Sequence, residues 1–436
     1  MTTDQQNRPH PDEAGSTPAR SDRVGIGGRI KDRPEDFLVD ELPLEEPCGS
    51  GEHLWLLIEK RDATTSDISR ALARHFKVAP GAVSVAGIKD KCALTRQVFS
   101  VHIPGRNPRS FPAFEHPCAG VLWVDEHTSK IRRGQLEGNR FSIRIRGVSA
   151  TDAVRAKRVL DELAARGVPN RFGSQRFGVR GRNHLVGRAL WLGKWQEAMD
   201  LMLSPAPATP AAQQESCDHY AAGRYEDALR TLPRMLGLER SILREFVKTG
   251  KPGKAWKAVR PRERGFFISA LQSAIFNDVL DRRAADDTYD RALPGDLLLT
   301  PDGRNPQAVP VDSEVDSEIL VSVAEFERTP SGPMWGSNML RASGDVDALE
   351  VEALTGAGLT LEDLAAPADK AAEMTGGTRR PLRVMVSNTG VEGGLDEHGE
   401  FVRCSFDLPP GAFATEVMAA IMGSAPIIPN EPEVSQ

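Results

Sequence analysis

The stretch Gly87-Ile88-Lys89-Asp90-Lys91-Cys92-Ala93-Leu94-Thr95-Arg96-Gln97 is polar and lies between two runs that the sequence predicts to be buried strands. Residues 83–88 are apolar or small, and apolar residues alternate with polar ones over 99–103, which is typical of a half-buried strand. Asp90 is therefore expected on a rigid support where a core strand ends. Positive charges on Lys89 and Lys91 are expected to favour its ionised carboxylate, which can act as a nucleophile or a base. The alternative is a solvated Lys-Asp-Lys turn.

A second motif is Asn170-Arg171-Phe172-Gly173-Ser174-Gln175-Arg176-Phe177-Gly178, after a predicted helix over 152–166 that Gly167 and Pro169 end. The patterns Gly-x-Lys-Asp-Lys-x-Ala-x-Thr-x-Gln and Asn-x-Phe-Gly-x-Gln-Arg-Phe-Gly resemble the signatures of the TruD family of tRNA pseudouridine synthases. The resemblance extends from about residue 30 to about residue 422. It implies an α+β fold class: a pseudouridine synthase catalytic fold, with a mixed, largely antiparallel sheet flanked by helices, and an inserted α+β TRUD domain.

The length of 436 residues predicts two domains, because one hydrophobic core seldom serves so long a chain. Residues 1–22 are rich in polar residues and proline and are expected to form a disordered tail. Composition shifts near residue 195, and strand patterns return over 382–386 and 401–406. The catalytic domain is therefore expected to be discontinuous, over 23–195 plus 389–424, with the inserted domain at 196–388 and a C-terminal tail at 425–436.

The family resemblance also assigns roles to individual residues. Asp90 takes the position of the catalytic aspartate. Lys31 opens a run that is similar to the family motif Lys-x-x-Pro-Glu-Asp-Phe, which implies that Lys31 supports Asp90. The resemblance further implies that four residues bind the substrate base: Phe37, Asn170, Phe172 and Phe413. From the residues alone, Lys31 would be interpreted as a surface residue and the phenylalanines as core.

Charge distribution indicates where RNA could bind. The formal net charge is −6, yet residues 163–196 contain no Asp or Glu and several arginines, which predicts a local cationic surface. A second basic region lies over 130–146, where one face of a predicted strand carries arginine. Lysine and arginine side chains supply most of the sequence-independent affinity for phosphates. The residues expected to contact the RNA backbone are Lys130, Arg132, Arg133, Arg144, Arg146 and Arg176.

Cysteine and histidine usage argues against a metal centre. The five cysteines are scattered and never form a C-x-x-C pair, and the nine histidines show no ligand spacing. We therefore expect neither a metal, nor a cofactor, nor a disulfide framework. The sequence lacks an apolar stretch long enough to span a membrane and the apolar core of a signal peptide. These features predict a cytoplasmic protein with no membrane association. The family resemblance implies that the protein acts on tRNA, and we expect a monomer with no obligate protein partner.

The expected activity is the isomerisation of uridine to pseudouridine in tRNA, which the resemblance implies at position 13 of the D-arm after base flipping. The bond between ribose and N1 breaks, the base turns, and C5 joins the ribose. Asp90 either attacks the ribose or removes a sugar proton, and the sequence leaves both routes open. Two other classes also stay open: an RNA-binding or folding factor with a vestigial pocket, and a nucleoside hydrolase. Glycoside hydrolysis normally uses a pair of carboxylates, and only Asp90 is well placed here, which argues against the hydrolase.

Overall fold

The computed structural model describes residues 25–423, which form two compact units. The sheet unit comprises residues 25–168 and 384–423, and the insert unit comprises Pro169–Arg383. Short strands β7 (Val168–Pro169) and β12 (Arg383–Val384) pair where the chain passes from one unit to the other. The tails predicted at 1–22 and 425–436 lie outside the described residues.

The sheet unit is built on an eight-stranded sheet in the order β13-β14-β6-β1-β4-β2-β5, with β3 paired to β4. Every pairing in it is antiparallel except that of β1 with β4. The strands are β1 (Phe37–Pro43), β2 (His53–Arg61), β3 (Val83–Val85), β4 (Leu94–His102), β5 (Ala119–His127), β6 (Leu136–Arg146), β13 (Ser387–Asp396) and β14 (Gly399–Leu408). The predicted α+β class with a largely antiparallel sheet is confirmed.

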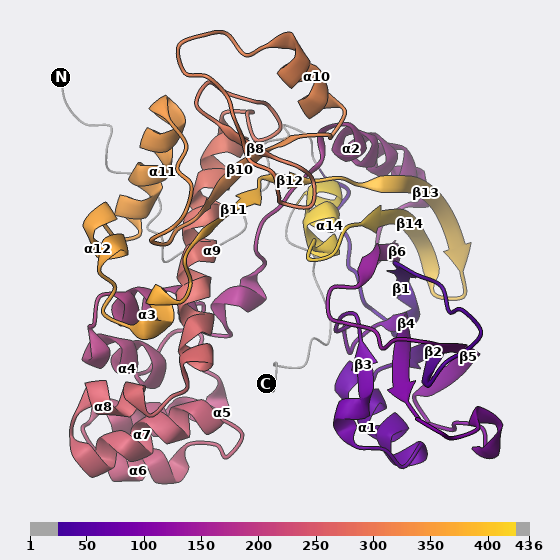
Figure 1. Cartoon of the computed structure of the whole chain (residues 1–436), viewed down its shortest axis with the longest axis horizontal. Coiled ribbons are helices and arrows are strands. Elements are labelled where there is room, and N and C mark those ends of the chain that lie inside the picture. Colours follow the sequence, from indigo (N-terminus) through magenta and orange to yellow (C-terminus); the bar gives the residue numbers. More distant parts are fainter. Residues whose placement is uncertain (1–24, 424–436) are drawn as a thin grey trace. The chain divides into compact units, whose positions relative to one another are not determined.

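Three α-helices accompany this sheet within the described residues: α1 (Thr65–His75), α2 (Ala153–Arg166) and α14 (Ala414–Met422). Helix α2 packs on α14 and on strands β13 and β14 (Figure 1). Leu160 of α2 and Val417 of α14 are fully buried with Phe406 of β14. Helix α1 begins at a Thr64 capping box and buries its apolar face against β2 and β4. Each helix therefore covers the sheet with one apolar face.

The insert unit combines many helices with a four-stranded antiparallel sheet in the order β11-β10-β8-β9 (Figure 1). The strands are β8 (Leu297–Leu299), β9 (Gln307–Ala308), β10 (Thr329–Met334) and β11 (Thr378–Pro381). The helices are α3 (Asn183–Trp191), α4 (Trp195–Leu203), α5 (Ala211–Ala221), α6 (Tyr225–Thr231), α7 (Gly237–Thr249), α8 (Pro252–Lys257), α9 (Pro261–Ala285), α10 (Ser317–Ala324), α11 (Gly344–Gly356), α12 (Leu361–Ala365) and α13 (Lys370–Glu373). None of the helices within residues 25–423 combines the length and apolar character needed to cross a membrane.

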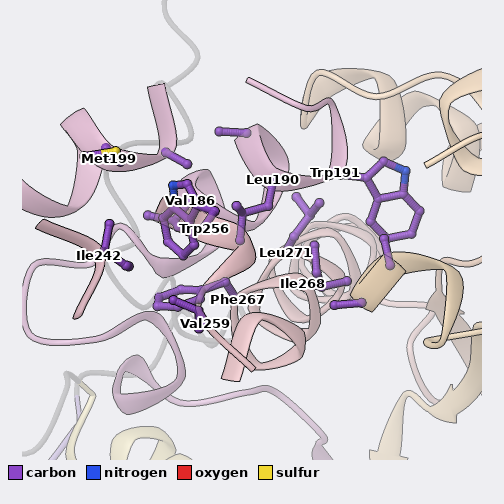
Figure 2. Close-up of a cluster of buried hydrophobic side chains, with 14 of the residues drawn as sticks. Val186, Leu190, Trp191, Met199, Ile242, Trp256, Val259, Phe267, Ile268 and Leu271 are labelled. Atoms are coloured by element: carbon purple, nitrogen blue, oxygen red, sulfur yellow. The ribbon is translucent and has the colours of Figure 1, made fainter. Parts of the chain in front are cut away.

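The main core of the insert unit lies where α3, α4, α7 and α8 meet the long helix α9 (Figure 2). Trp256 is fully buried there, its ring edge faces Phe267, and its Nε1 donates to the carbonyl oxygen of Trp195 at 3.1 Å. Trp191 likewise donates to the carbonyl oxygen of Asp363 at 2.8 Å. Both indole N–H groups are therefore satisfied although the rings are buried.

The boundaries between the units differ from those that the sequence analysis predicted. The division follows Val168 rather than residue 195, and Arg383 rather than residue 388. Helix α3 belongs to the insert unit because Gly187 lets it approach α9 closely, where a Cβ would overlap the carbonyl oxygen of Phe267. Val386 belongs to the sheet unit because its side chain is buried in that unit's core. Composition alone carries neither signal.

Candidate active site

Asp90 lies in the loop between β3 and β4, beside the chain segment that leads into β1. Its Oδ2 accepts a hydrogen bond from Nζ of Lys31 at 2.9 Å. The Lys31 side chain is 8% exposed and the Asp90 side chain 53% exposed. The ammonium is thus fixed in the protein while the carboxylate stays accessible to a substrate.

Sheet topology explains why Lys31 and Asp90 meet. Strands β1 and β4 are parallel neighbours, with Leu38 opposite Leu94. The segments that precede the two strands therefore lie at the same end of the sheet. Lys31 lies six residues before Phe37, the first residue of β1, and has a left-handed backbone with φ of 59°. Left-handed geometry is uncommon for a residue other than glycine and is concentrated at functional sites.

Buried polar contacts hold the loop that carries Asp90. Nζ of Lys60, on β2, donates to the backbone carbonyl oxygen of Asp90 at 2.7 Å. The hydroxyl of Thr65 accepts from the backbone N–H of Lys89 at 3.1 Å and donates to the side chain of Gln97 at 2.9 Å. Gln97 in turn donates to the carbonyl oxygen of Gly87 at 3.1 Å. The loop is therefore tied to α1, β2 and β4.

Lys89 does not support Asp90 in the way that the sequence analysis predicted. Its Nζ lies 2.7 Å from Oε2 of Glu41, and both side chains are buried. Oε1 of the same carboxylate accepts from the backbone N–H of Val98 at 3.2 Å. Lys89 therefore anchors the loop to β1, and Lys31 is the cation that contacts the Asp90 carboxylate.

Lys60 is the residue of this site that the sequence analysis missed. Its side chain is fully buried, and burial lowers its pKa from the ordinary lysine value to about 8, although the charge of Asp90 opposes this shift. A detectable signal exists in the sequence. Ile58 and Lys60 are two residues apart in a strand, so their side chains lie on the same face of the sheet. Because Ile58 is buried on that face, Lys60 is buried there too.

The two aromatic residues predicted in this unit have different environments. Phe37 is 3% exposed, packs edge-to-face on Phe141, and lies under Nζ of Lys31 at 4.4 Å from its ring centroid. It is thus mainly a core residue, and its contact with a base stays a prediction. Phe413 is 41% exposed at the start of α14, so part of its ring is accessible. Its role as an aromatic wall also stays a prediction.

Asn170 and Phe172 belong to the insert unit, and their predicted part in the same site as Asp90 stays a prediction. Asn170 is buried, and its Nδ2 donates to the carbonyl oxygen of Pro381 at 2.9 Å. Its Oδ1 accepts from Arg380. The backbone of Phe172 exchanges two hydrogen bonds of 2.9 Å with the side-chain amide of Asn277. Both residues are therefore held by their own unit.

The predicted RNA contacts of the sheet unit fall into two groups. Lys130, Arg132 and Arg133 are exposed in the loop between β5 and β6. Arg144 is partly exposed over the ring of Phe401, 3.8 Å from a carboxylate oxygen of Asp36 and 3.9 Å from one of Asp396. These four keep accessible cationic groups, so their contact with RNA stays a prediction.

The structure contradicts the predicted RNA contact of Arg146. This side chain is 4% exposed and lies 2.6 Å from a carboxylate oxygen of Asp36 and 2.7 Å from one of Asp396. The two carboxylates raise the pKa of the guanidinium and occupy its donors. These carboxylates come from η1 (Pro34–Asp36) and from the end of β13, which are both distant from Arg146 in the sequence.

The acid-free segment 163–196 does not form a continuous cationic surface either. Arg171 pairs with Asp281, and Arg188 lies 3.0 Å from Glu197. Arg180 donates to backbone carbonyl oxygens, at 2.6 Å to that of Met202. Acids and carbonyl groups from other parts of the chain thus neutralise or bind these arginines. Arg176, the remaining predicted contact, has no carboxylate within 4.0 Å among residues 25–423.

The site offers an accessible carboxylate with an oriented oxygen. Oδ2 of Asp90 is held by Lys31, and its backbone is held by Lys60, so the side chain has a defined direction. A carboxylate prepared in this way can attack an electrophilic sugar carbon or accept a proton. The loop contacts reduce the reorganisation that either step requires.

Comparisons with known proteins find similar proteins over nearly the whole chain. The family model described as tRNA pseudouridine synthase D (TruD) matches residues 15–421. A tRNA pseudouridine synthase D of Geobacter metallireducens is 37% identical over 400 residues, covering 91% of this chain and 95% of the relative. One of Geotalea daltonii is also 37% identical, over 95% of this chain and 100% of the relative. A crystal structure of the Methanosarcina mazei protein that carries the TruD name matches with a TM-score of 0.79 and 28% identity, over 94% of this chain and 97% of that one.

Proposed function

Because the chain belongs to the TruD family of tRNA pseudouridine synthases, we propose that it converts uridine 13 in the D-arm of tRNA to pseudouridine with Asp90 as its catalytic carboxylate. The enzyme is an isomerase that acts on tRNA. In the reaction the bond between N1 and C1′ breaks, the uracil turns, and C5 bonds to C1′. The C5 proton is lost and N1 gains a proton, so substrate and product have the same composition.

The ion pair between Lys31 and Asp90 carries this proposal. An accessible carboxylate whose partner is a buried ammonium at 2.9 Å is suited to attack at C1′ or to removal of a ribose proton. Lys60, Thr65 and Lys89 hold the loop, so the carboxylate approaches the ribose without reorganising its backbone. Lys31 pairs with the Asp90 carboxylate before attack, and pairs with it again when the sugar departs and the negative charge returns to Asp90.

The base must leave the helical stack to reach a carboxylate on a protein loop. Extrusion costs a few kcal/mol, and stacking on an aromatic ring returns about 1–3 kcal/mol per base. We assign this stacking to Phe413, whose ring is accessible, and to Phe37 and Phe172. Asn170 is the proposed hydrogen-bond partner of the base or ribose. Lys130, Arg132, Arg133, Arg144 and Arg176 are the proposed contacts to RNA phosphates.

The remaining expectations concern the state of the protein. We propose that it acts as a cytoplasmic monomer without an obligate protein partner, cofactor or metal. Gel filtration at working concentration, together with activity after exhaustive chelation, tests these points. A dimer, or loss of activity that added metal restores, contradicts them.

The direct test of the function uses two tRNA transcripts that differ only at position 13, with uridine in one and cytidine in the other. The purified protein is expected to form pseudouridine in the first transcript, at position 13 alone. Modification at another uridine contradicts the assigned position. Free uracil indicates a nucleoside hydrolase, and tight binding of both transcripts without a modified base indicates an RNA-binding factor.

A further inference from the structure

Rings and guanidinium groups alternate within the insert unit. The guanidinium of Arg380 lies over Phe172 with its central carbon 4.2 Å from the ring centroid, and 5.6 Å from that of Phe276. The guanidinium of Arg176 lies 5.9 Å from the ring centroid of Phe172 and 5.2 Å from that of Phe266. The resulting ladder runs in the order Phe266, Arg176, Phe172, Arg380, Phe276. Cation–π attraction stabilises each contact.

The ladder leaves two positive charges without a negative partner. Neither Arg176 nor Arg380 has a carboxylate within 4.0 Å among residues 25–423. Arg176 donates to the hydroxyl of Ser269, and its buried Nε has no hydrogen-bond partner. Arg380 donates to the backbone and side-chain oxygens of Asn170.

Three buried arginines of the same unit are neutralised. Each has a carboxylate oxygen within hydrogen-bond distance: Arg264 with Asp369 at 2.8 Å, Arg283 with Asp296 at 2.9 Å, and Arg379 with Glu350 at 2.6 Å. This is the usual arrangement, because an unpaired buried charge is costly. Arg176 and Arg380 are only partly buried and lack such a carboxylate, so an anion from outside the chain can pair with them.

Burial weakens the hold of both arginines on their protons, and repulsion from Arg176 adds to this effect at Arg380. Burial lowers the pKa of Arg176, and burial together with the charge of Arg176 lowers the pKa of Arg380 to about 10. Arg380 is therefore charged at neutral pH. An anion beside Arg176 would relieve this repulsion.

The two ends of the ladder differ in exposure. Phe276 is fully buried, whereas Phe266 on α9 is 39% exposed. Arg176 is the ladder cation next to this exposed ring. An accessible aromatic ring beside an unpaired guanidinium is the combination with which proteins bind unpaired nucleotides, since the ring stacks on a base and the cation pairs with a phosphate.

We propose that Phe266 and Arg176 form an RNA-contact site of the insert unit, at which the ring stacks on an unpaired base of the tRNA and the guanidinium binds an adjacent phosphodiester. Arg380 raises the local positive potential. The inference rests on the proposed function for the identity of the RNA, and adds a site in the insert unit, which does not contain Asp90.

The test measures the dissociation constant for tRNA over a range of KCl concentrations. Arg176→Gln is expected to make the slope of log K against log[KCl] shallower by about 0.7–0.9, the effect of one lost phosphate contact. Phe266→Ala is expected to weaken binding by about 5- to 150-fold, which corresponds to a stacking contribution of about 1–3 kcal/mol, and to leave the slope unchanged. The matched control is Arg234→Gln, because Arg234 is exposed in the loop between α6 and α7. It is expected to change neither quantity.

A wild-type slope for Arg176→Gln, or wild-type affinity for Phe266→Ala, overturns the proposal. Thermal unfolding will show whether Arg176→Gln folds. If it does not, Arg176→Lys and Phe266→Ala decide: Arg176→Lys keeps the charge and is expected to keep the wild-type slope, and Phe266→Ala lacks the ring and is expected to bind more weakly. Pseudouridine formation by the wild-type protein is measured in parallel. If no pseudouridine forms, the proposed function is contradicted, and the binding results still decide whether Phe266 and Arg176 contact RNA.

Discussion

Nζ of Lys60 donates a hydrogen bond to the backbone carbonyl oxygen of Asp90 at 2.7 Å, from a side chain that is completely buried. This contact joins an inner strand to the loop that carries the candidate catalytic carboxylate. Lys60 is therefore a positioning residue, because it acts on the substrate only through the backbone of Asp90. Its effect should be visible in both rate and stability.

Replacing Lys60 with Met should slow the single-turnover reaction by about tenfold, the equivalent of about 1.4 kcal/mol in barrier height, because the Asp90 loop loses its buried donor. Affinity for tRNA, measured by filter binding, should stay near that of the wild type. A rate equal to that of the wild type removes Lys60 from the positioning role. Loss of tRNA affinity alone would do the same.

Lys60 also predicts a pH dependence of folding. Its pKa is about 8 in the folded protein and about 10.4 in an unfolded chain, so between these values the unfolded state binds more protons. The free energy of unfolding contributed by Lys60 should therefore rise as pH increases from about 8 to 10. Urea unfolding of the wild type and of Lys60→Met measures the difference. A wild-type curve parallel to that of Lys60→Met over this window contradicts the assignment.

Lys31 should affect catalysis rather than RNA binding. Its ammonium lies 2.9 Å from Oδ2 of Asp90 and is almost buried, so Lys31→Met leaves the carboxylate without its orienting partner. The single-turnover rate at saturating tRNA should fall by about 10²-fold, as a misplaced catalytic group typically causes. Lys257→Met in α8 is the matched control, because Lys257 is exposed in the insert unit. Equal rates for the two variants would show that the ion pair has no catalytic part.

Thr65 should contribute to the stability of the loop. Its hydroxyl bonds to the backbone N–H of Lys89 and to Gln97, and both contacts are buried. Thr65→Val keeps the shape but leaves these groups unsatisfied, which should cost about 1–3 kcal/mol of unfolding free energy. Ser69→Ala, on the same helix, should change it by no more than about 0.5 kcal/mol. Similar values for both variants in urea unfolding would show that the Thr65 hydroxyl is dispensable.

Arg146 should stabilise the fold without binding RNA. Arg146→Met leaves the fully buried Asp36 without its closest cation and should cost about 3–5 kcal/mol of unfolding free energy. In conditions where the variant is folded, the salt dependence of tRNA binding should equal that of the wild type. Arg133→Gln, in the exposed loop before β6, should instead make this dependence shallower with no loss of stability. The reverse pattern would restore Arg146 to the RNA surface.

Local patterns in the sequence predicted those parts of the structure that short segments determine. The strands on either side of Asp90 and helix α2 with its end at Gly167 follow from periodicity, glycine and proline. The meeting of Lys31 with Asp90 was implied by the family resemblance, and the parallel pairing of β1 with β4 supplies its physical cause.

The errors arose where distant segments decide the environment of a residue. Arg146 has the pattern of an exposed strand face, but Asp396 reaches it from a strand 250 residues further along the chain. Arg171 lies in an acid-free segment but pairs with Asp281 of α9. Neither partner is visible to local composition, because contacts across a fold do not follow sequence distance. The cationic ladder of Arg176 and Arg380 was missed for the same reason.

The most direct test of the account replaces Asp90 with Asn, which keeps the size of the side chain and removes its charge. Mapping of pseudouridine in a tRNA transcript should show no modified base, while tRNA binding changes by no more than about 0.5 kcal/mol. Asp312→Asn, at an exposed aspartate of the insert unit, should remain fully active. Pseudouridine formation by Asp90→Asn at the rate of the wild type would contradict the central claim that this carboxylate carries the reaction.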